Sequence, residues 1–149
     1  MYENYTHQAL PSKRYCELLG TAICVFNSNN SFIIENILRE DISKEFSWHD
    51  LIDRTSGQLK APIRKTITEK AGSQIFDLFS NIVKKRNRII HSFQVTAPVD
   101  GDISDDMDRQ VLATKYEDGR QEYITEEFLL DFIKLNDELS RKLHDFRGF

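Results

Sequence analysis

Apolar residues recur at the spacing of an amphipathic helix over most of the chain. The clearest stretch covers residues 74–92. At about 100° per residue its apolar side chains fall within one stripe, which contains Ile75, Phe79, Ile82, Ile89, Ile90 and Phe93. The same spacing predicts helices over residues 13–27, 31–40 and about 57–70, a short helix after Ser47 and a long last helix after Thr125. The chain is therefore predicted to be mainly helical.

Polar residues set the predicted helix ends. Ser12, Ser47 and Thr125 are predicted N-caps, because a hydroxyl oxygen can accept a backbone N–H of the first turn. The polar cluster at residues 27–30 is predicted to end the first helix. Trp48 follows an N-cap, and we expect it to be an aromatic core anchor rather than a site residue.

The pattern changes after residue 93. Residues 110–116 and 120–124 favour β-strands, and they flank an Asp-Gly pair that is typical of a tight hairpin turn. Five acidic residues within 100–108 predict a solvated surface loop. The expected fold class is all-α, mainly a helical bundle, with a small two-stranded β-hairpin inserted between the last two long helices. Residues 1–149 are expected to form a single domain.

Composition and charge narrow the class of protein. The 149 residues are 40% hydrophobic, which suits one domain with a real core. The net charge of −4 excludes a globally basic nucleic-acid binder but not a local basic patch. Neither an apolar run of about 20 residues nor a signal-peptide pattern is present, so we expect a cytoplasmic protein without a membrane role. Cys16 and Cys24 would lie ~12 Å apart on one helix, too far for a disulfide.

One basic stretch combines charge with helical position. Lys84, Lys85, Arg86 and Arg88 lie within five residues at the end of the clearest helix. Arg86 projects about 20° from Ile75, near the centre of the apolar stripe. A charge there is costly unless it is paired or faces a shared, partly wet surface. The sequence leaves two interpretations open, an ion pair with a carboxylate on a neighbouring helix and a contact with phosphate.

Most enzyme classes have no support in this sequence. It contains no HExxH, no Cys/His set with zinc spacing, no Walker loop and no GxSxG. No metal site is expected. Two polar residues of the basic helix end remain as candidates: Asn87 and His91 are four residues apart, so their side chains can touch.

The run Arg86-Asn87-x-x-x-His91 resembles the motif of the HEPN superfamily (higher eukaryotes and prokaryotes nucleotide-binding domains). The resemblance covers this motif and the helical layout. It implies a helical bundle that is commonly a homodimer, in which the motifs of two protomers line one cleft. Many members are metal-independent endoribonucleases in toxin–antitoxin, phage-defence or RNA-processing systems. Others bind nucleotides, RNA or proteins without catalysis. In one toxin branch a tyrosine lies two residues after the histidine; here that position is Phe93.

The chemistry of these residues suits RNA cleavage without a metal or other cofactor. A histidine exchanges protons near neutral pH, so His91 is the candidate general acid and base. Arg86 would stabilise the charge that develops on the phosphate, and Asn87 would orient the histidine or the ribose. Phosphate-holding roles are expected for Lys84, Lys85 and Arg88. The expected product is a 2′,3′-cyclic phosphate, and an antitoxin or regulatory protein is a possible partner.

Two alternatives stay open at this stage. His91 suits the carboxyl end of a helix, where the helix dipole favours a cation. The domain as a whole could be a non-catalytic module for binding a nucleotide, RNA or protein. A geometric point favours a dimer, since Arg86 and His91 project roughly 140° apart on an ideal helix. One straight helix would not direct both side chains at one phosphate. A cleft between two copies, the long reach of the Arg86 side chain or a distortion of the helix near His91 can each solve this.

Overall fold

The computed structural model describes residues 5–98 and 108–148. The predicted acidic loop therefore lies almost wholly outside the described residues. The elements in chain order are α1 (Lys13–Glu40), α2 (Trp48–Asp53), the 3-10 helix η2 (Ser56–Leu59), α3 (Lys60–Lys65), α4 (Ile67–Ala71), α5 (Gln74–Ile90), β1 (Phe93–Pro98), β2 (Asp108–Lys115), β3 (Gln121–Ile124) and α6 (Glu126–Arg147). The prediction of a mainly helical chain is confirmed.

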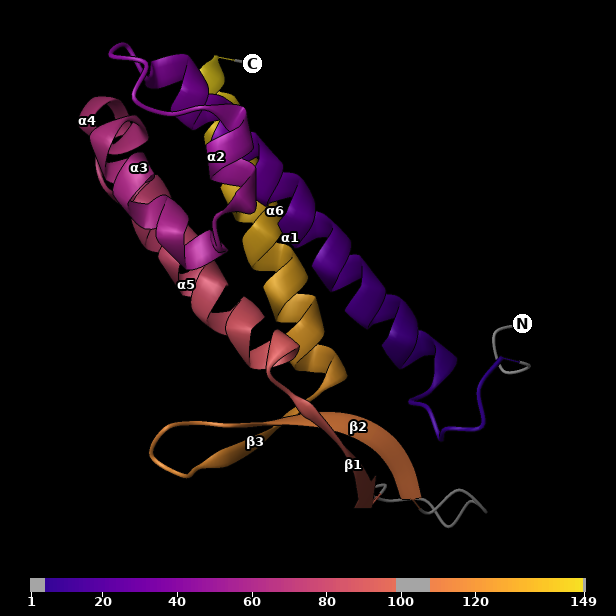
Figure 1. The fold of residues 1–149 in the computed structure, drawn as a ribbon. Coiled ribbons are helices and arrows are strands. Elements are labelled where there is room, and N and C mark those ends of the chain that lie inside the picture. Colours follow the sequence, from indigo (N-terminus) through magenta and orange to yellow (C-terminus); the bar gives the residue numbers. More distant parts are fainter. Residues whose placement is uncertain (1–4, 99–107, 149) are drawn as a thin grey trace.

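The three long helices form the body of the molecule (Figure 1). Helix α6 packs against both α1 and α5. Its apolar stripe meets theirs in one core, in which Phe26 and Phe132 stack with their ring centroids 6.3 Å apart. Burying a side chain of this size contributes about 1.5–3 kcal/mol. Of the stripe predicted for α5, the residues Ile75, Phe79, Ile82 and Ile89 are buried in this core, whereas Ile90 and Phe93 are exposed and Phe93 belongs to the strand that follows.

Helix α1 runs without a break through residues 27–30, so the predicted end of the first helix is wrong. Asn29 is buried, and its amide nitrogen donates to the carbonyl oxygen of Asn136 at 2.8 Å and to its side-chain oxygen at 3.0 Å. Asn30 accepts the hydroxyl of Ser56 at 3.1 Å. These tertiary hydrogen bonds give the polar side chains partners outside the helix, and this removes their competition with the helical backbone.

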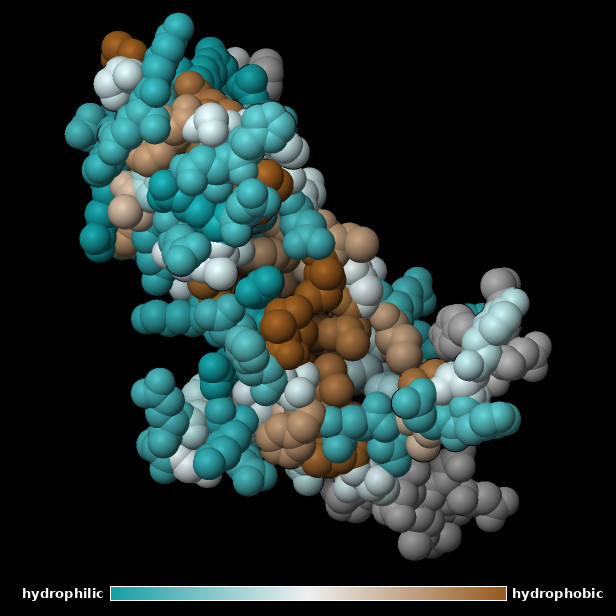
Figure 2. Space-filling model, in the orientation of Figure 1, coloured by the Kyte–Doolittle hydropathy of each residue, from teal (hydrophilic) through white to brown (hydrophobic). Residues whose placement is uncertain are grey.

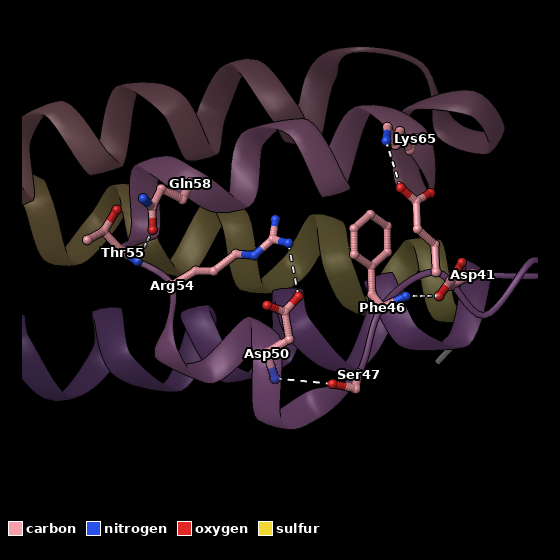
Figure 3. Close-up of polar contacts among 9 residues, drawn as sticks. Asp41, Phe46, Ser47, Asp50, Arg54, Thr55, Gln58 and Lys65 are labelled. Atoms are coloured by element: carbon pink, nitrogen blue, oxygen red, sulfur yellow. Dashed lines mark hydrogen bonds and ion pairs between the residues drawn. The ribbon is translucent and has the colours of Figure 1, made fainter.

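Two of the predicted N-caps lie at the starts of α2 and α6. Ser47 accepts the N–H of Asp50, as its predicted N-cap role requires (Figure 3). Thr125 accepts the N–H of Phe128 and caps α6 as predicted. Trp48 is 51% exposed, and its ring lies edge-on to that of His49 with the centroids 5.3 Å apart, so its predicted role as a core anchor is wrong.

The described residues form a three-stranded antiparallel sheet in the order β1-β2-β3, not a two-stranded hairpin. The hairpin of β2 and β3 is as predicted, but no strand was predicted over β1, whose first residue, Phe93, was assigned to the apolar stripe of the preceding helix. In β1, Phe93 pairs with Ala113 and Val95 with Val111. The added strand supplies the backbone partners that an isolated hairpin lacks, and such a hairpin is marginal in water.

A buried tyrosine joins the sheet to the helices. The phenol of Tyr15 on α1 donates to the carbonyl of Ile124 at 2.5 Å and accepts the N–H of Leu112 at 3.2 Å. Burial raises the pKa of Tyr15, since the phenolate would have to lose its hydration there. The sheet is therefore held at one end of the bundle, beside the carboxyl end of α5 (Figure 1).

Within the described ranges, no helix has both the length and the apolar composition that a membrane span requires. Cys16 and Cys24 are both free thiols.

Candidate nucleic-acid interface

The predicted motif lies where α5 meets the sheet. Helix α5 ends at Ile90, and His91 is its C-cap with φ −94° and ψ 26°. The hydroxyl of Ser92 donates to the carbonyl of Ile89 at 2.6 Å, which satisfies one of the free carbonyls at the helix end. The chain then turns into β1. The motif therefore occupies a helix terminus that is fixed by a cap on one side and by a strand on the other.

Arg86 has an aromatic and an amide partner. Its Nη1 donates to the side-chain oxygen of Asn87 at 3.2 Å, and its guanidinium carbon lies 5.4 Å from the ring centroid of Phe26 on α1. The side chain is half-buried. Among the side chains that the structure describes, Arg86 forms no ion pair. The interpretation that it pairs with a carboxylate on a neighbouring helix is not what the described residues show.

His91 is exposed at the helix end, and its backbone N–H donates to the carbonyl of Asn87 at 3.0 Å. Arg86 extends over α1, whereas His91 reaches solvent one turn beyond Asn87. No contact joins the side chains of Arg86 and His91 within the described part of this one chain. This agrees with the angle of roughly 140° between Arg86 and His91 on an ideal helix.

A pocket of about 620 Å³ opens beside α5. It lies between the second half of α5, the β2–β3 turn and the first turn of α6, and its lining residues are Asn81, Lys84, Lys85, Asn87, Arg88, Tyr116, Glu117, Asp118, Arg120 and Phe128. Figure 2 shows mainly hydrophilic residues around the hollow between the bundle and the hairpin, at the left of the view. The volume is that of a small-molecule site.

Tyr116 is the centre of the hairpin side of this pocket. Its ring centroid lies 5.6 Å from the guanidinium carbon of Arg88 and 4.2 Å from that of Arg120. Its hydroxyl donates to Glu122, and this hydrogen bond to a carboxylate is the main reason that the pKa of Tyr116 is raised. Arg88 also donates to the carbonyl of Lys115 at 2.8 Å. Arg88, predicted to hold phosphate, thus also fastens the hairpin to α5.

The cations around the end of α5 and the β2–β3 turn have no ion-pair partner among the described side chains. Lys85 lies over the ring of Phe128, with its Nζ 5.5 Å from the centroid. None of Lys84, Lys85, Arg86, Arg88 and Arg120 forms an ion pair with any carboxylate whose side chain is described. The pocket lining has four cationic and two acidic side chains, a formal surplus of two positive charges in a chain of net charge −4. This surplus attracts an anion.

Of the predicted site residues, the structure brings Lys84, Lys85, Asn87 and Arg88 together around the pocket and leaves Arg86 and His91 outside its lining. The sequence argument missed Tyr116, Arg120 and Phe128. The sequence does show Tyr116 and Arg120 beside the predicted Asp-Gly turn, and this could have marked the turn as a candidate binding element. Its position next to α5, however, depends on the tertiary fold. Among the described residues, no group of three or more His, Cys, Asp or Glu side chains is arranged to hold a metal ion.

Comparison of the chain with protein families, with curated proteins and with solved structures yields no match. The functional argument for this protein therefore depends on its own residues.

Proposed function

We propose that this protein is a metal-independent endoribonuclease of HEPN type that acts as a homodimer. The observation that carries the proposal is the set of cations around the end of α5. These side chains contact rings, an amide and a backbone carbonyl, none forms an ion pair with a described carboxylate, and they lie beside an exposed histidine. A cationic surface with an available imidazole is what binding and cleavage of RNA require.

The proposed reaction is attack of a ribose 2′-oxygen on the adjacent phosphorus. As the 2′-oxygen bonds to phosphorus, the bond from phosphorus to the 5′-oxygen breaks, giving a 2′,3′-cyclic phosphate and a free 5′-hydroxyl. His91 takes the 2′-hydroxyl proton, and the imidazolium so formed gives a proton to the leaving 5′-oxygen. Arg86 stabilises the charge on the non-bridging phosphate oxygens. Asn87, which accepts the guanidinium hydrogen bond, keeps Arg86 in place and orients the ribose or His91.

A second copy of the chain completes the proposed site. Arg86 and His91 face different ways on one helix, and a cleft between two protomers can bring one residue from each to a single phosphate. The surface beside Arg86 suits such a contact, because Ile90 and Phe93 are 46% and 42% exposed. Figure 2 shows a band of hydrophobic residues between α1 and α5, above the sheet. A homodimer packed on this face would place two copies of the motif around one cleft.

The biological setting that we propose is a toxin, phage-defence or RNA-processing system in the cytoplasm, with an antitoxin or regulatory protein as a possible partner. Phe93 stands where one toxin branch has the tyrosine that a partner enzyme modifies. The hydroxyl needed for that modification is absent from this position, so we do not propose regulation by that route.

A second candidate function is RNA or nucleotide binding without cleavage. One observation favours it: the basic pocket is complete in a single chain, whereas Arg86 and His91 are not among its lining residues. In this alternative the pocket performs the function, and the exposed His91 is a helix-end residue favoured by the dipole.

The test is cleavage of a mixed RNA by the purified protein in the presence of EDTA, which removes divalent metal ions. We expect cleavage by the wild type and a decrease of about 10²–10⁴-fold in His91→Ala and in Arg86→Ala. His49→Ala and Arg39→Ala change an exposed histidine and an exposed arginine outside the proposed site and serve as matched controls. Equal cleavage by all variants contradicts the proposal, and tight binding without cleavage by the wild type favours the second candidate.

A further inference from the structure

The pocket between α5 and the β2–β3 turn has a role of its own in the proposed reaction. We infer that it binds one phosphorylated ribonucleotide unit of the substrate, next to the linkage that is cut, with the phosphate held by Lys84, Lys85 and Arg120. The choice of RNA as ligand rests on the proposed function. The choice of a phosphate rests on the charges and contacts of the pocket itself.

Three cations surround the space from two sides. Lys84 and Lys85 extend from α5, and Arg120 directly precedes the first residue of β3. Lys84 and Arg120 are exposed, Lys85 is half-buried, and none has a carboxylate partner among the described side chains. Positive charges at this proximity repel one another unless an anion lies between them. A phosphate, with several acceptor oxygens, satisfies donors from both sides at once.

The hairpin side of the pocket is organised before any ligand arrives. Arg88 donates to the carbonyl of Lys115, and the guanidinium of Arg120 lies 4.2 Å from the ring centroid of Tyr116. Gly119 adopts a φ of +89°, a conformation that the turn requires and that glycine takes without steric cost. An arginine already ordered by stacking loses less side-chain entropy when it binds a ligand.

The two acidic residues of the turn leave the cations available. Asp118 accepts the backbone N–H of Arg120 at 2.9 Å, so one oxygen of its carboxylate stabilises the turn itself. Neither Glu117 nor Asp118 forms an ion pair with the cations of this pocket. The surplus positive charge is therefore open to a ligand and not cancelled within the protein.

The pocket face of α5 leads to the candidate catalytic residues. His91 follows Lys84 by seven residues, which places it within about 20° of Lys84 around the helix and roughly 10 Å further along the axis. Asn87 lies between them, lines the pocket and accepts the hydrogen bond of Arg86. An RNA strand that leaves the pocket along this face reaches His91, so the nucleotide in the pocket would be a neighbour of the cut linkage.

The experiment measures binding of a short single-stranded 2′-O-methyl RNA by fluorescence anisotropy, because this RNA cannot be cleaved through a 2′-hydroxyl. We expect Lys84→Gln and Arg120→Gln each to weaken binding about tenfold, since each removes one charged hydrogen bond. Each is also expected to lower the salt dependence of binding by about one ion. Lys134→Gln, at an exposed position of α6 outside the pocket, is the matched control. Competition with AMP and with inorganic phosphate shows whether a free phosphate is accepted or only one within a strand.

Unchanged binding in both pocket variants overturns the inference, and so does wild-type protein that binds no RNA. Poly-glutamate that binds as tightly as the RNA overturns it too, because it assigns the cations to an acidic protein partner. Circular dichroism melting shows that each variant is folded. Cleavage of unmodified RNA in EDTA keeps the two proposals apart. Pocket-dependent binding without cleavage supports the pocket and contradicts the nuclease, whereas cleavage with unchanged binding in the variants does the reverse.

Discussion

Two regions of the molecule differ in how their surface cations are paired. Near α2, two cations have carboxylate partners: Lys65 pairs with Glu45 at 2.8 Å and Arg54 with Asp50 at 2.9 Å (Figure 3). Near the sheet, the cations around α5 and the β2–β3 turn have none among the described side chains.

This difference separates a solvated surface from a candidate site. Exposed ion pairs contribute little to stability, but they cancel local charge. A cluster of uncancelled cations carries a cost of mutual repulsion in the folded protein, and this cost is offset when an anionic ligand binds. Net charge and composition do not reveal the difference, because they describe the whole chain and not where its charges lie.

The largest effect on stability is expected where the sheet joins the bundle. Tyr15→Phe leaves the carbonyl of Ile124 and the N–H of Leu112 without their buried partner, so we expect it to lower the free energy of unfolding by about 1–3 kcal/mol. Tyr123→Phe, at a 51% exposed position of β3, should change it by less than about 0.5 kcal/mol. Urea unfolding measures both, and equal effects of the two substitutions would contradict the role of Tyr15.

The contribution of Tyr15 to the free energy of unfolding is expected to decrease at high pH. Its pKa in the folded protein lies above the ordinary value of 10.0, mainly because of burial. The phenol therefore contributes stability that is fully present below pH 10 and is lost as pH rises towards the folded pKa. We expect the free energy of unfolding of wild type to fall more steeply above pH 10 than that of Tyr15→Phe.

A smaller effect on the free energy of unfolding is expected when one lysine from each of the two regions is replaced. Lys65→Gln removes an ion pair and is expected to lower the free energy of unfolding by about 0.2–1 kcal/mol. Lys84→Gln removes a cation whose charged neighbours within one turn of α5 are other cations, among them Lys85 and Arg88, so it should leave stability unchanged or raise it slightly. Urea unfolding at low salt shows the difference, and it should shrink at high salt. A loss of stability in Lys84→Gln as large as in Lys65→Gln would show that the two regions are alike.

The smallest effect concerns Asp41 at the end of α1. The N–H of Phe46 donates to its carboxylate at 2.8 Å, and this hydrogen bond holds the pKa of Asp41 below the ordinary value of 3.8. Asp41 therefore contributes stability above pH 3.8 that is lost as pH falls through its lower folded pKa. We expect wild type to be slightly more stable than Asp41→Asn at pH 7, and the gap in urea midpoint to narrow in acid. A gap that does not change with pH would contradict this assignment.

The elements that the sequence predicts well are those with a local cause. Helix α5 and helix α6 have long regular stripes, and the turn at Gly119 has a specific dipeptide. The continuity of α1 was not predictable, because it depends on Asn29 meeting Asn136 on a helix far along the chain. Strand β1 was missed for a similar reason, since its partner β2 lies beyond the segment that follows Pro98.

In the candidate site, too, the residues close together in the sequence could be predicted and those brought in by the tertiary fold could not. Arg86, Asn87 and His91 lie within six residues, so their motif is visible in the sequence. Tyr116 and Arg120 lie beside the basic face of α5 only because the tertiary fold places the hairpin there. The partner of Arg86 was equally out of reach, because nothing local indicates that its guanidinium would lie over Phe26.

The central claim is that Arg86 of one protomer and His91 of another act on the same phosphate. Mixing Arg86→Ala protein with His91→Ala protein, with time for subunit exchange, tests it in one cleavage assay with EDTA. Random exchange makes half of the dimers mixed, and each mixed dimer has one complete site, so we predict recovery of about a quarter of the wild-type rate. A mixture as inactive as the two separate variants, although the chains have exchanged, would contradict the claim.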